Sequence, residues 1–147
     1  MLLLKVIAVA ALAVAIAVAV VIFTLPKSNP GVPDVKFADF TPDRIDIKVG
    51  ESTKVIFNVQ NLESRAITDA KVVTVIEPSS YQPYLSIDKP TVNLPDLQSK
   101  DARTGQMQVT ITAASAPAKE AVYKVKGALF AEGKQTDVRE FELRIRE

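Results

Sequence analysis

The feature that most constrains this chain is an uncharged apolar segment near its amino terminus. Residues 6–25 read VIAVAALAVAIAVAVVIFTL, in which Thr24 is the only polar residue. An α-helix of about 20 residues is roughly 30 Å long, which matches the hydrocarbon core of a bilayer. We therefore expect residues 1–25 to form one transmembrane helix, retained as a signal-anchor. The remainder of the chain would then fold on one side of the membrane.

A cleaved signal peptide is the alternative interpretation of this segment. Lys5 would supply its basic region, and the triplet Ala17–Ala19 has the Ala-x-Ala form of a cleavage site. The apolar run is longer than the about 7–15 residues of a signal-peptide core, which favours a retained anchor. Lys27, Lys36 and Arg44 oppose an N-in orientation under the positive-inside rule. We nevertheless expect the amino terminus inside, because the short tail resembles a signal-peptide start, and the C-terminal domain to be extracytoplasmic.

Alanines recur along the expected helix at a spacing that suggests a packing face. On a helix, Ala11, Ala15 and Ala19 fall on one stripe, with Ala8 nearby. Small residues at such spacing let two membrane helices approach closely. We interpret the stripe as a contact with another membrane helix, although alanine is also common in signal-anchors without any such role.

The composition excludes several classes of function. The chain contains neither cysteine nor histidine, so it lacks thiolate ligands, the usual general base and the commonest transition-metal ligand. Lys5 is one of 18 Lys and Arg residues, and the 17 that follow it balance 17 Asp and Glu. A neutral domain is not expected to bind nucleic acid. We expect no enzymatic activity, no cofactor, no metal and no small-molecule substrate.

Residues 26–34, PKSNPGVPD, contain three prolines and a glycine and are expected to form a linker. Residues 35–147 then show short runs with strand character, separated by Pro, Gly, Asn and Ser. We expect seven or eight strands in an all-β, immunoglobulin-like Greek-key sandwich, preceded by the one transmembrane helix. The first run, at 35–40, is broken by Pro42 and resumes at 44–49, and two short pieces at 84–87 and 91–94 are separated by Pro90. The other runs are at 52–61, 68–77, 107–113, 121–130 and 135–145.

Three of these segments carry more specific expectations. In residues 44–49, alternation places Ile45, Ile47 and Val49 on one face. Residues 68–77 contain a valine-rich run, which predicts a central strand buried on both sides or one whose outer face is covered. A short helix at 113–119 stays an open alternative.

One family resemblance accompanies these patterns. The stretch Val49-Gly50-Glu51-Ser52-x-Lys54-Val55-x-Phe57-x-Val59-x-Asn61, together with Tyr123-x-Val125-x-Gly127, resembles the CARDB domain, a cell-adhesion-related module of bacterial and archaeal surface proteins. The resemblance covers roughly residues 35–147. It implies an extracytoplasmic binding or spacer role without catalytic residues. Gly50 would form the turn. Tyr123 would be either a tyrosine corner, bonded through its hydroxyl to upstream backbone, or an ordinary core aromatic.

Two sets of residues are candidates for binding. Tyr81 and Tyr84 lie beside prolines in the loop 77–84, and exposed tyrosines favour interfaces, so we consider them for a partner contact; packing of the loop onto the sandwich is the alternative. Four aspartates are close in sequence but lack EF-hand spacing, so solvated carboxylates are expected rather than calcium ligands. They are Asp34, Asp39, Asp43 and Asp46.

These observations favour a single-pass membrane protein that works by protein–protein contact. Its partners would be membrane lipid and other membrane or cell-surface subunits, with an archaeal cell envelope as the suggested setting. A membrane-tethered ligand- or glycan-binding module is the alternative. A second alternative is a component of an archaeal surface filament, similar to a pilin or an archaellum stator, although the amino terminus lacks a typical pilin-like processing site.

Overall fold

The computed structural model describes residues 31–81, 84–116 and 119–147. The expected transmembrane helix at 1–25 and most of the linker lie outside these residues. Within the described ranges, no helix has the length and apolar character needed to cross a bilayer.

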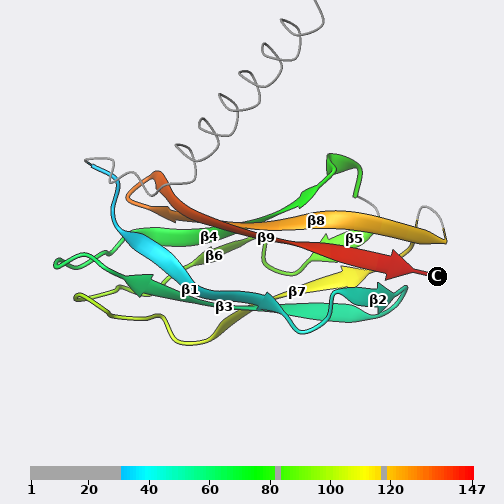
Figure 1. Cartoon of the computed structure of the whole chain (residues 1–147), viewed down its shortest axis with the longest axis horizontal. Helices are drawn as coiled ribbons and strands as arrows, with labels where there is room; N and C mark the ends of the chain where they lie inside the picture. Colours follow the sequence, from blue (N-terminus) through cyan, green and yellow to red (C-terminus); the bar gives the residue numbers. More distant parts are fainter. Residues whose placement is uncertain (1–30, 82–83, 117–118) are drawn as a thin grey trace, which may run out of the picture. The chain divides into compact units, whose positions relative to one another are not determined.

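The described residues form two β-sheets that pack as a sandwich (Figure 1). The four-stranded sheet has the order β1-β3-β7-β5: β1 (Val35–Pro42), β3 (Ser52–Asn61), β7 (Met107–Ala113) and β5 (Leu85–Ile87). The five-stranded sheet has the order β2-β9-β8-β4-β6: β2 (Asp46–Lys48), β9 (Lys134–Arg146), β8 (Glu120–Ala131), β4 (Ala70–Glu77) and β6 (Thr91–Asn93). One 3₁₀ turn, η1 (Ser79–Tyr81), follows β4. The all-β class expected from the sequence is therefore confirmed for this part of the chain.

Each edge of the sandwich is formed by a strand that breaks and changes sheet. Pro42 ends β1, which pairs with β3, and the chain then crosses to pair β2 with β9 in parallel. Pro90 separates β5, which pairs with β7, from β6, which pairs with β4. Proline cannot donate to a ladder and is tolerated where pairing ends. Counting each broken strand once gives the seven strands of an immunoglobulin-like arrangement, with the first, second, fifth and fourth in one sheet.

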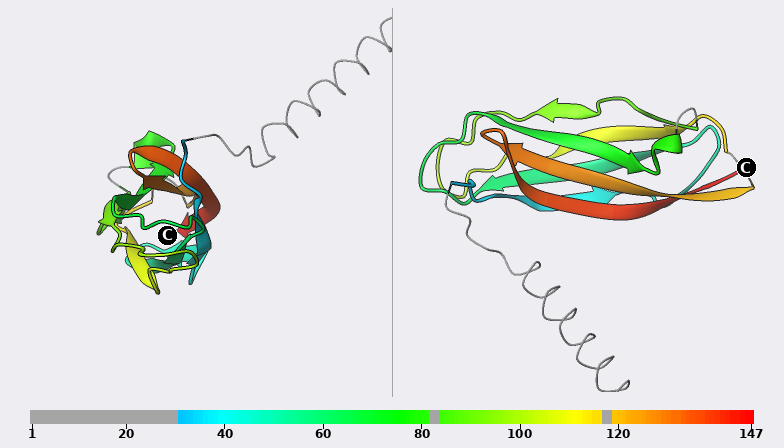
Figure 2. Two further views of the ribbon diagram at one scale, coloured as in Figure 1. Left: turned by 90° about the vertical axis from the view of Figure 1, so that its left-hand side faces the viewer. Right: turned by 90° about the horizontal axis from the view of Figure 1, so that it is seen from above.

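The core consists of inward side chains from strands with clean alternation. Every second residue of β3 is buried, including Val55, Phe57 and Val59, and the same holds along β8. The carboxyl half of β9 buries Leu143 and Ile145. These predicted in–out patterns are confirmed. Figure 2 shows β8 and β9 running side by side, and they are paired from Glu120 with Arg146 to Ala131 with Lys134.

An aromatic side chain joins the two halves of this core. Phe40 of β1 packs against both buried clusters, with its ring centroid 5.2 Å from that of Phe37 and 6.1 Å from that of Phe141 on β9. The ring lies directly over Gly127 of β8, where a Cβ atom would sit 2.3 Å from its Cε2 atom. Glycine at this position therefore provides the space for Phe40.

Several local predictions were wrong. The strand expected at 44–49 is only three residues long, so Ile47 is buried but Ile45 is 60% exposed and Val49 is also exposed. The cause is the change of sheet before β2 and the turn at Gly50 after it. The valine-rich strand β4 is not buried on both sides, because it alternates strictly.

Two boundaries also differ from expectation. No helix occurs in residues 113–116 or 119, which are the described part of the segment where one was left open. Pro33 and Asp34, assigned to the linker, belong to the sandwich: Pro33 is buried, and the Asp34 carbonyl accepts a hydrogen bond from the Leu62 amide.

Candidate interaction surface

The outer faces of the two sheets differ in chemistry. The four-stranded sheet exposes mainly uncharged hydroxyl and amide side chains, and the hydroxyls of Ser52 and Thr112 are hydrogen-bonded at 2.8 Å. The other members of this face include Asn58, Gln60, Gln108 and Thr110. The five-stranded sheet instead exposes aliphatic side chains among charged ones. A surface of the second kind has more to gain from contact with another protein.

Five apolar side chains are contiguous on the outer face of the five-stranded sheet. Val73 of β4 lies opposite Ala128 of β8, and Ala128 lies opposite Val138 of β9, so the three form one row across three strands. Val75 and Phe130 are each two residues away along their strands and extend the row. We call these five residues the valine patch. Val75 is 44% exposed and Val138 is 39% exposed, so the described residues do not cover the patch.

Ion pairs border the valine patch on one side. Lys126 of β8 lies 3.0 Å from Glu77 of β4, and Lys124 lies 3.8 Å from Glu140 of β9. The Lys71 ammonium lies 5.9 Å from the centre of the Phe130 ring. Each exposed pair stabilises the fold by only about 0–1 kcal/mol, so the pairs matter more as the polar rim of a contact surface.

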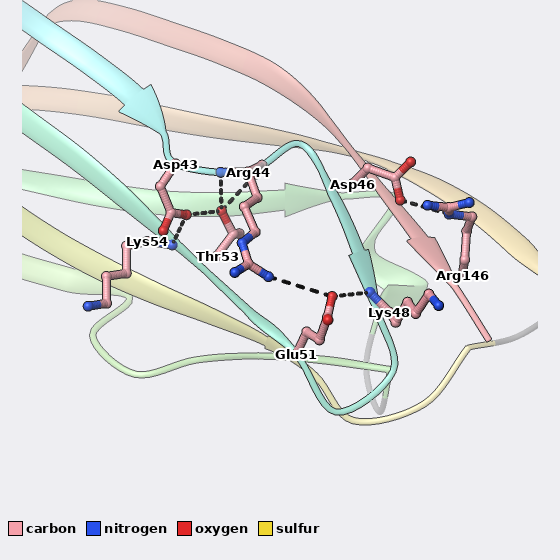
Figure 3. A network of polar contacts seen from close by, with 8 residues as sticks. All are labelled: Asp43, Arg44, Asp46, Lys48, Glu51, Thr53, Lys54 and Arg146. Atoms are coloured by element: carbon pink, nitrogen blue, oxygen red, sulfur yellow. Dashed lines mark hydrogen bonds and ion pairs between the residues drawn. The ribbon is translucent and has the colours of Figure 1, made fainter.

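The change of sheet between β1 and β2 is held by a polar network (Figure 3). The Asp43 carboxylate accepts hydrogen bonds of 2.8 Å from the Lys54 amide and from the buried Thr53 hydroxyl, which also bonds to the Arg44 carbonyl. Hydrogen bonds from Lys54 and then Thr53 lower the pKa of Asp43 below its usual range. Further along, the Arg146 side chain donates to Asp46 at 2.9 Å.

The acidic residues considered as calcium ligands are thus engaged in local contacts. Besides Asp43 and Asp46, Asp39 accepts a hydrogen bond from the Thr41 hydroxyl, and Asp34 lies 3.6 Å from Lys36. Among the described residues, no three acidic side chains are grouped so that they could hold a metal ion.

The three tyrosines lie at the same end of the core. Tyr81 and Tyr84 are half-buried and pack against the cluster that contains Tyr123. Tyr123 is buried on β8, and burial, followed by the neighbouring Tyr84, raises the pKa of its phenol. Tyr123 is thus part of the core cluster, and its role as a tyrosine corner stays a prediction. The structure therefore shows Tyr81 and Tyr84 packed onto the sandwich, and a partner contact through them stays a prediction.

Two other residues from the sequence motif have structural roles. Gly50 has φ = 89° in the turn between β2 and β3, and its amide donates to the Ala113 carbonyl at 2.7 Å. Asn61 is fully buried at the end of β3; its side-chain amide donates to the carbonyls of Arg65 and Leu97 and its oxygen accepts from the Glu63 amide. It therefore ties the loop after β3 to the loop after β6.

The predicted helix-packing residues lie outside the described residues. They are Ala8, Ala11, Ala15 and Ala19. The valine patch, in contrast, was not identified as a site from the sequence. Its only signal was the valine-rich run in 68–77, because its other members come from strands that are distant along the chain.

Comparison with known proteins finds similarity at the level of structure. No protein-family model matches the sequence, and no curated protein matches it. Native α-2-macroglobulin from Escherichia coli, in a structure that spans domain MG7 to the C-terminus, has a TM-score of 0.52 at 10% identity, over 78% of this chain and 17% of that one. The CARDB domain of a Pyrococcus furiosus protein, crystallised with di-metal ions, has a TM-score of 0.49 at 14% identity, over 78% of this chain and 94% of the domain. A FixG-related protein from Vibrio parahaemolyticus has a TM-score of 0.48 at 11% identity, over 79% of this chain and 98% of that one.

These similarities concern the fold alone. The strand order and the macroglobulin match agree on an immunoglobulin-like sandwich. The CARDB domain named from the sequence is found again among the structural neighbours.

Proposed function

We propose that this chain is a single-pass, membrane-anchored extracytoplasmic protein that acts by protein–protein contact, as an accessory or structural subunit of a membrane complex or cell-surface assembly. The observation that carries the contact role is the valine patch, an uncovered apolar surface with a charged rim. The anchor is supported by the apolar segment 6–25 alone.

A contact role agrees with the residue types in the chain and with the contacts of its buried polar side chains. It has no histidine and no cysteine, and its buried polar side chains of Thr53 and Asn61 are engaged in holding loops and strands. A glycan-binding module would be expected to present an aromatic platform. The described tyrosines instead pack against the core, which favours a protein partner.

The contact role is tested by purification of the tagged full chain, in a mild detergent, from cells that naturally produce it. We expect a defined partner to co-purify with the wild-type protein and to be lost with Val75→Asp. Gln108→Asp introduces the same charge on the outer face of the other sheet and should retain the partner. A wild-type protein that runs as a lone monomer would refute the proposal. Retention of the partner by Val75→Asp would refute the role of the patch.

The anchor is tested separately by the intact mass of the mature protein. We expect the full apolar segment to be present and the protein to fractionate with membranes. A mature chain that begins near Val20 and is recovered in the soluble fraction would show that the segment is a cleaved signal peptide.

A further inference from the structure

In the described part of the chain, the middle of β9 has a hydrogen-bonded strand on one side only. Its full length pairs with β8, but on the opposite side β2 pairs only with Arg144–Arg146. Among the described residues, no strand pairs with Val138–Glu142 on that side. This stretch is the open edge of β9, and it exists because the first strand of the fold breaks and changes sheet.

The backbone of the open edge offers hydrogen-bonding groups to a further strand. The Arg144 amide donates to the Ile45 carbonyl, on the side away from β8. Since backbone groups alternate in direction along a strand, the amides and carbonyls of Glu142 and Glu140 also point away from β8. The Val138 amide is bonded to the adjacent Asp137 carboxylate at 2.9 Å, which leaves Glu140 and Glu142 as the available pair.

The β1 strand lies beside β9 without forming a ladder with it. The Phe37 amide donates to the Asp137 carboxylate at 3.0 Å, and the Arg139 guanidinium donates to the Phe37 carbonyl at 3.4 Å. The side chains of Asp137 and Arg139 therefore provide the hydrogen-bond partners of the Phe37 amide and carbonyl on this side of β1. β1 forms no backbone ladder with Glu140 or Glu142 of β9 among the described residues.

The charges on this edge indicate what kind of strand would fit. Glu140 and Glu142 lie on the outer face of β9, opposite Lys126 and Lys124 of β8. Lys126 lies 3.0 Å from Glu77, so Lys124 is the main cation available to the two carboxylates. A strand on the free side of β9 would gain most from basic residues at alternate positions, since opposite charges across strands contribute about 0.2–1 kcal/mol per pair.

A second copy of this chain fits the edge poorly. Antiparallel pairing of two β9 edges about Glu140 would place that carboxylate directly opposite its own copy. Like charges at such positions are destabilising.

We propose that the open edge Val138–Glu142 binds an extended segment of a partner protein as an added strand, with Lys or Arg at two alternate positions and an aliphatic residue between them. The proposal rests on the contact role proposed above and assigns that role a specific mode. The edge lies along the border of the valine patch, since Val138 belongs to both, so a bound strand would extend the same surface.

The test uses the full chain in mild detergent and a synthetic peptide, acetyl-Ser-Thr-Lys-Val-Lys-Val-Thr-Ser-amide. Hydrogen exchange followed by NMR should show new protection of the Glu140 and Glu142 amides when the peptide is added. Glu142→Lys should weaken binding about tenfold, as one attraction becomes a repulsion. Asp96→Lys is the control, with the same change from an acidic residue to lysine in the exposed loop after β6, and should bind as the wild type does. Glu140→Pro removes one edge donor without removing a bond to β8 and should abolish binding.

Two control peptides separate strand addition from simple charge attraction. The peptide with both lysines replaced by glutamate should not bind, and neither should the original sequence N-methylated at its four central residues. Equal binding of the N-methylated peptide, or peptide binding without amide protection at Glu140 and Glu142, would overturn the proposal. Protection of these amides in a dimer without peptide would also overturn it, in favour of a second copy. Loss of a co-purifying partner with Val75→Asp, together with no peptide binding, would leave the contact role standing and refute strand addition.

Discussion

Replacement of Gly127 by alanine is the substitution whose cost the structure predicts most specifically. The φ of Gly127 is not in the left-handed region, so alanine is compatible with the backbone there. The cost comes from space, because the new Cβ atom would lie 2.3 Å from Cε2 and 2.6 Å from Cζ of Phe40. Carbon atoms in favourable contact are about 3.5–4.0 Å apart, so the Phe40 ring must move by more than about 1 Å.

The magnitude follows from what surrounds that ring. Phe40 packs against both core clusters, and its displacement disturbs its contacts with Phe37 and Phe141. Overpacking of a filled core costs about 1–3 kcal/mol. We expect Gly127→Ala to destabilise the sandwich by about 2 kcal/mol, which corresponds to a fall in melting temperature of roughly 8 °C or more for a domain of this size.

A double-mutant cycle with Phe40→Ala isolates this contact. Phe40→Ala alone should destabilise the protein by about 2–3 kcal/mol, since the ring is only partly buried. In that background Gly127→Ala should be neutral or stabilising by up to about 1 kcal/mol, because alanine loses less backbone entropy than glycine. Urea denaturation of the full chain in mild detergent, followed by circular dichroism, measures all four variants. An equal cost of Gly127→Ala in both backgrounds would refute the placement of Phe40 over Gly127.

Three further outcomes follow from the polar contacts. Asn61→Ala should destabilise the protein by about 2–4 kcal/mol in the same assay, because it removes the Asn61 partner of the Arg65 carbonyl and the Glu63 amide and one of the two hydrogen bonds to the Leu97 carbonyl; a cost below about 1 kcal/mol would contradict the hydrogen bonds described. Gly50→Ala should cost about 1 kcal/mol in melting experiments, and Gly50→Asn less, because the residue has positive φ; equal stability of all three proteins would argue against that turn. The pKa of Asp43 is lower in the folded protein than in the unfolded chain, so its contribution is present above the unfolded pKa of about 3.9 and is lost as the pH falls through the folded value. Denaturation at pH 7 and pH 2.5 should therefore show a stability difference between wild type and Asp43→Asn that shrinks in acid, and a constant difference would contradict this assignment.

The strands with strict alternation were predictable from the sequence. In β3, Val55, Phe57 and Val59 alternate with polar residues, and a period of two places such residues on one face of any sheet. The same pattern located β8 and the carboxyl half of β9. These elements required no knowledge of their neighbours, because one face of each is apolar and the other polar.

The choice of sheet for the edge strands was not predictable in the same way. Alternation in 44–49 indicates a face but not which sheet the strand joins, and the break at Pro42 leaves room for only three paired residues. Ile45 consequently lies in the crossing and is exposed. Pairing partners are non-local, so they depend on loops and packing that no short window of sequence contains.

The valine patch could be predicted from the sequence only in part, for a related reason. The valine-rich run in 68–77 led to a prediction of burial on both faces or of a covered outer face. The structure shows Val73 and Val75 pointing outward, where they meet Ala128 and Val138 from strands more than 50 residues further along. Tyr81 and Tyr84 were considered for a partner contact because exposed tyrosines favour interfaces, with packing onto the sandwich as the alternative, and both pack against the core.

Site-specific photo-crosslinking in native membranes tests the central claim most directly. A photoreactive amino acid is placed at Val75, in the valine patch, or at Gln108, on the outer face of the other sheet. We predict a discrete adduct of a larger, defined mass from position 75 and no such adduct from position 108. Equal labelling from both positions, or no protein adduct from position 75, would contradict the conclusion that this face of the sandwich contacts a partner.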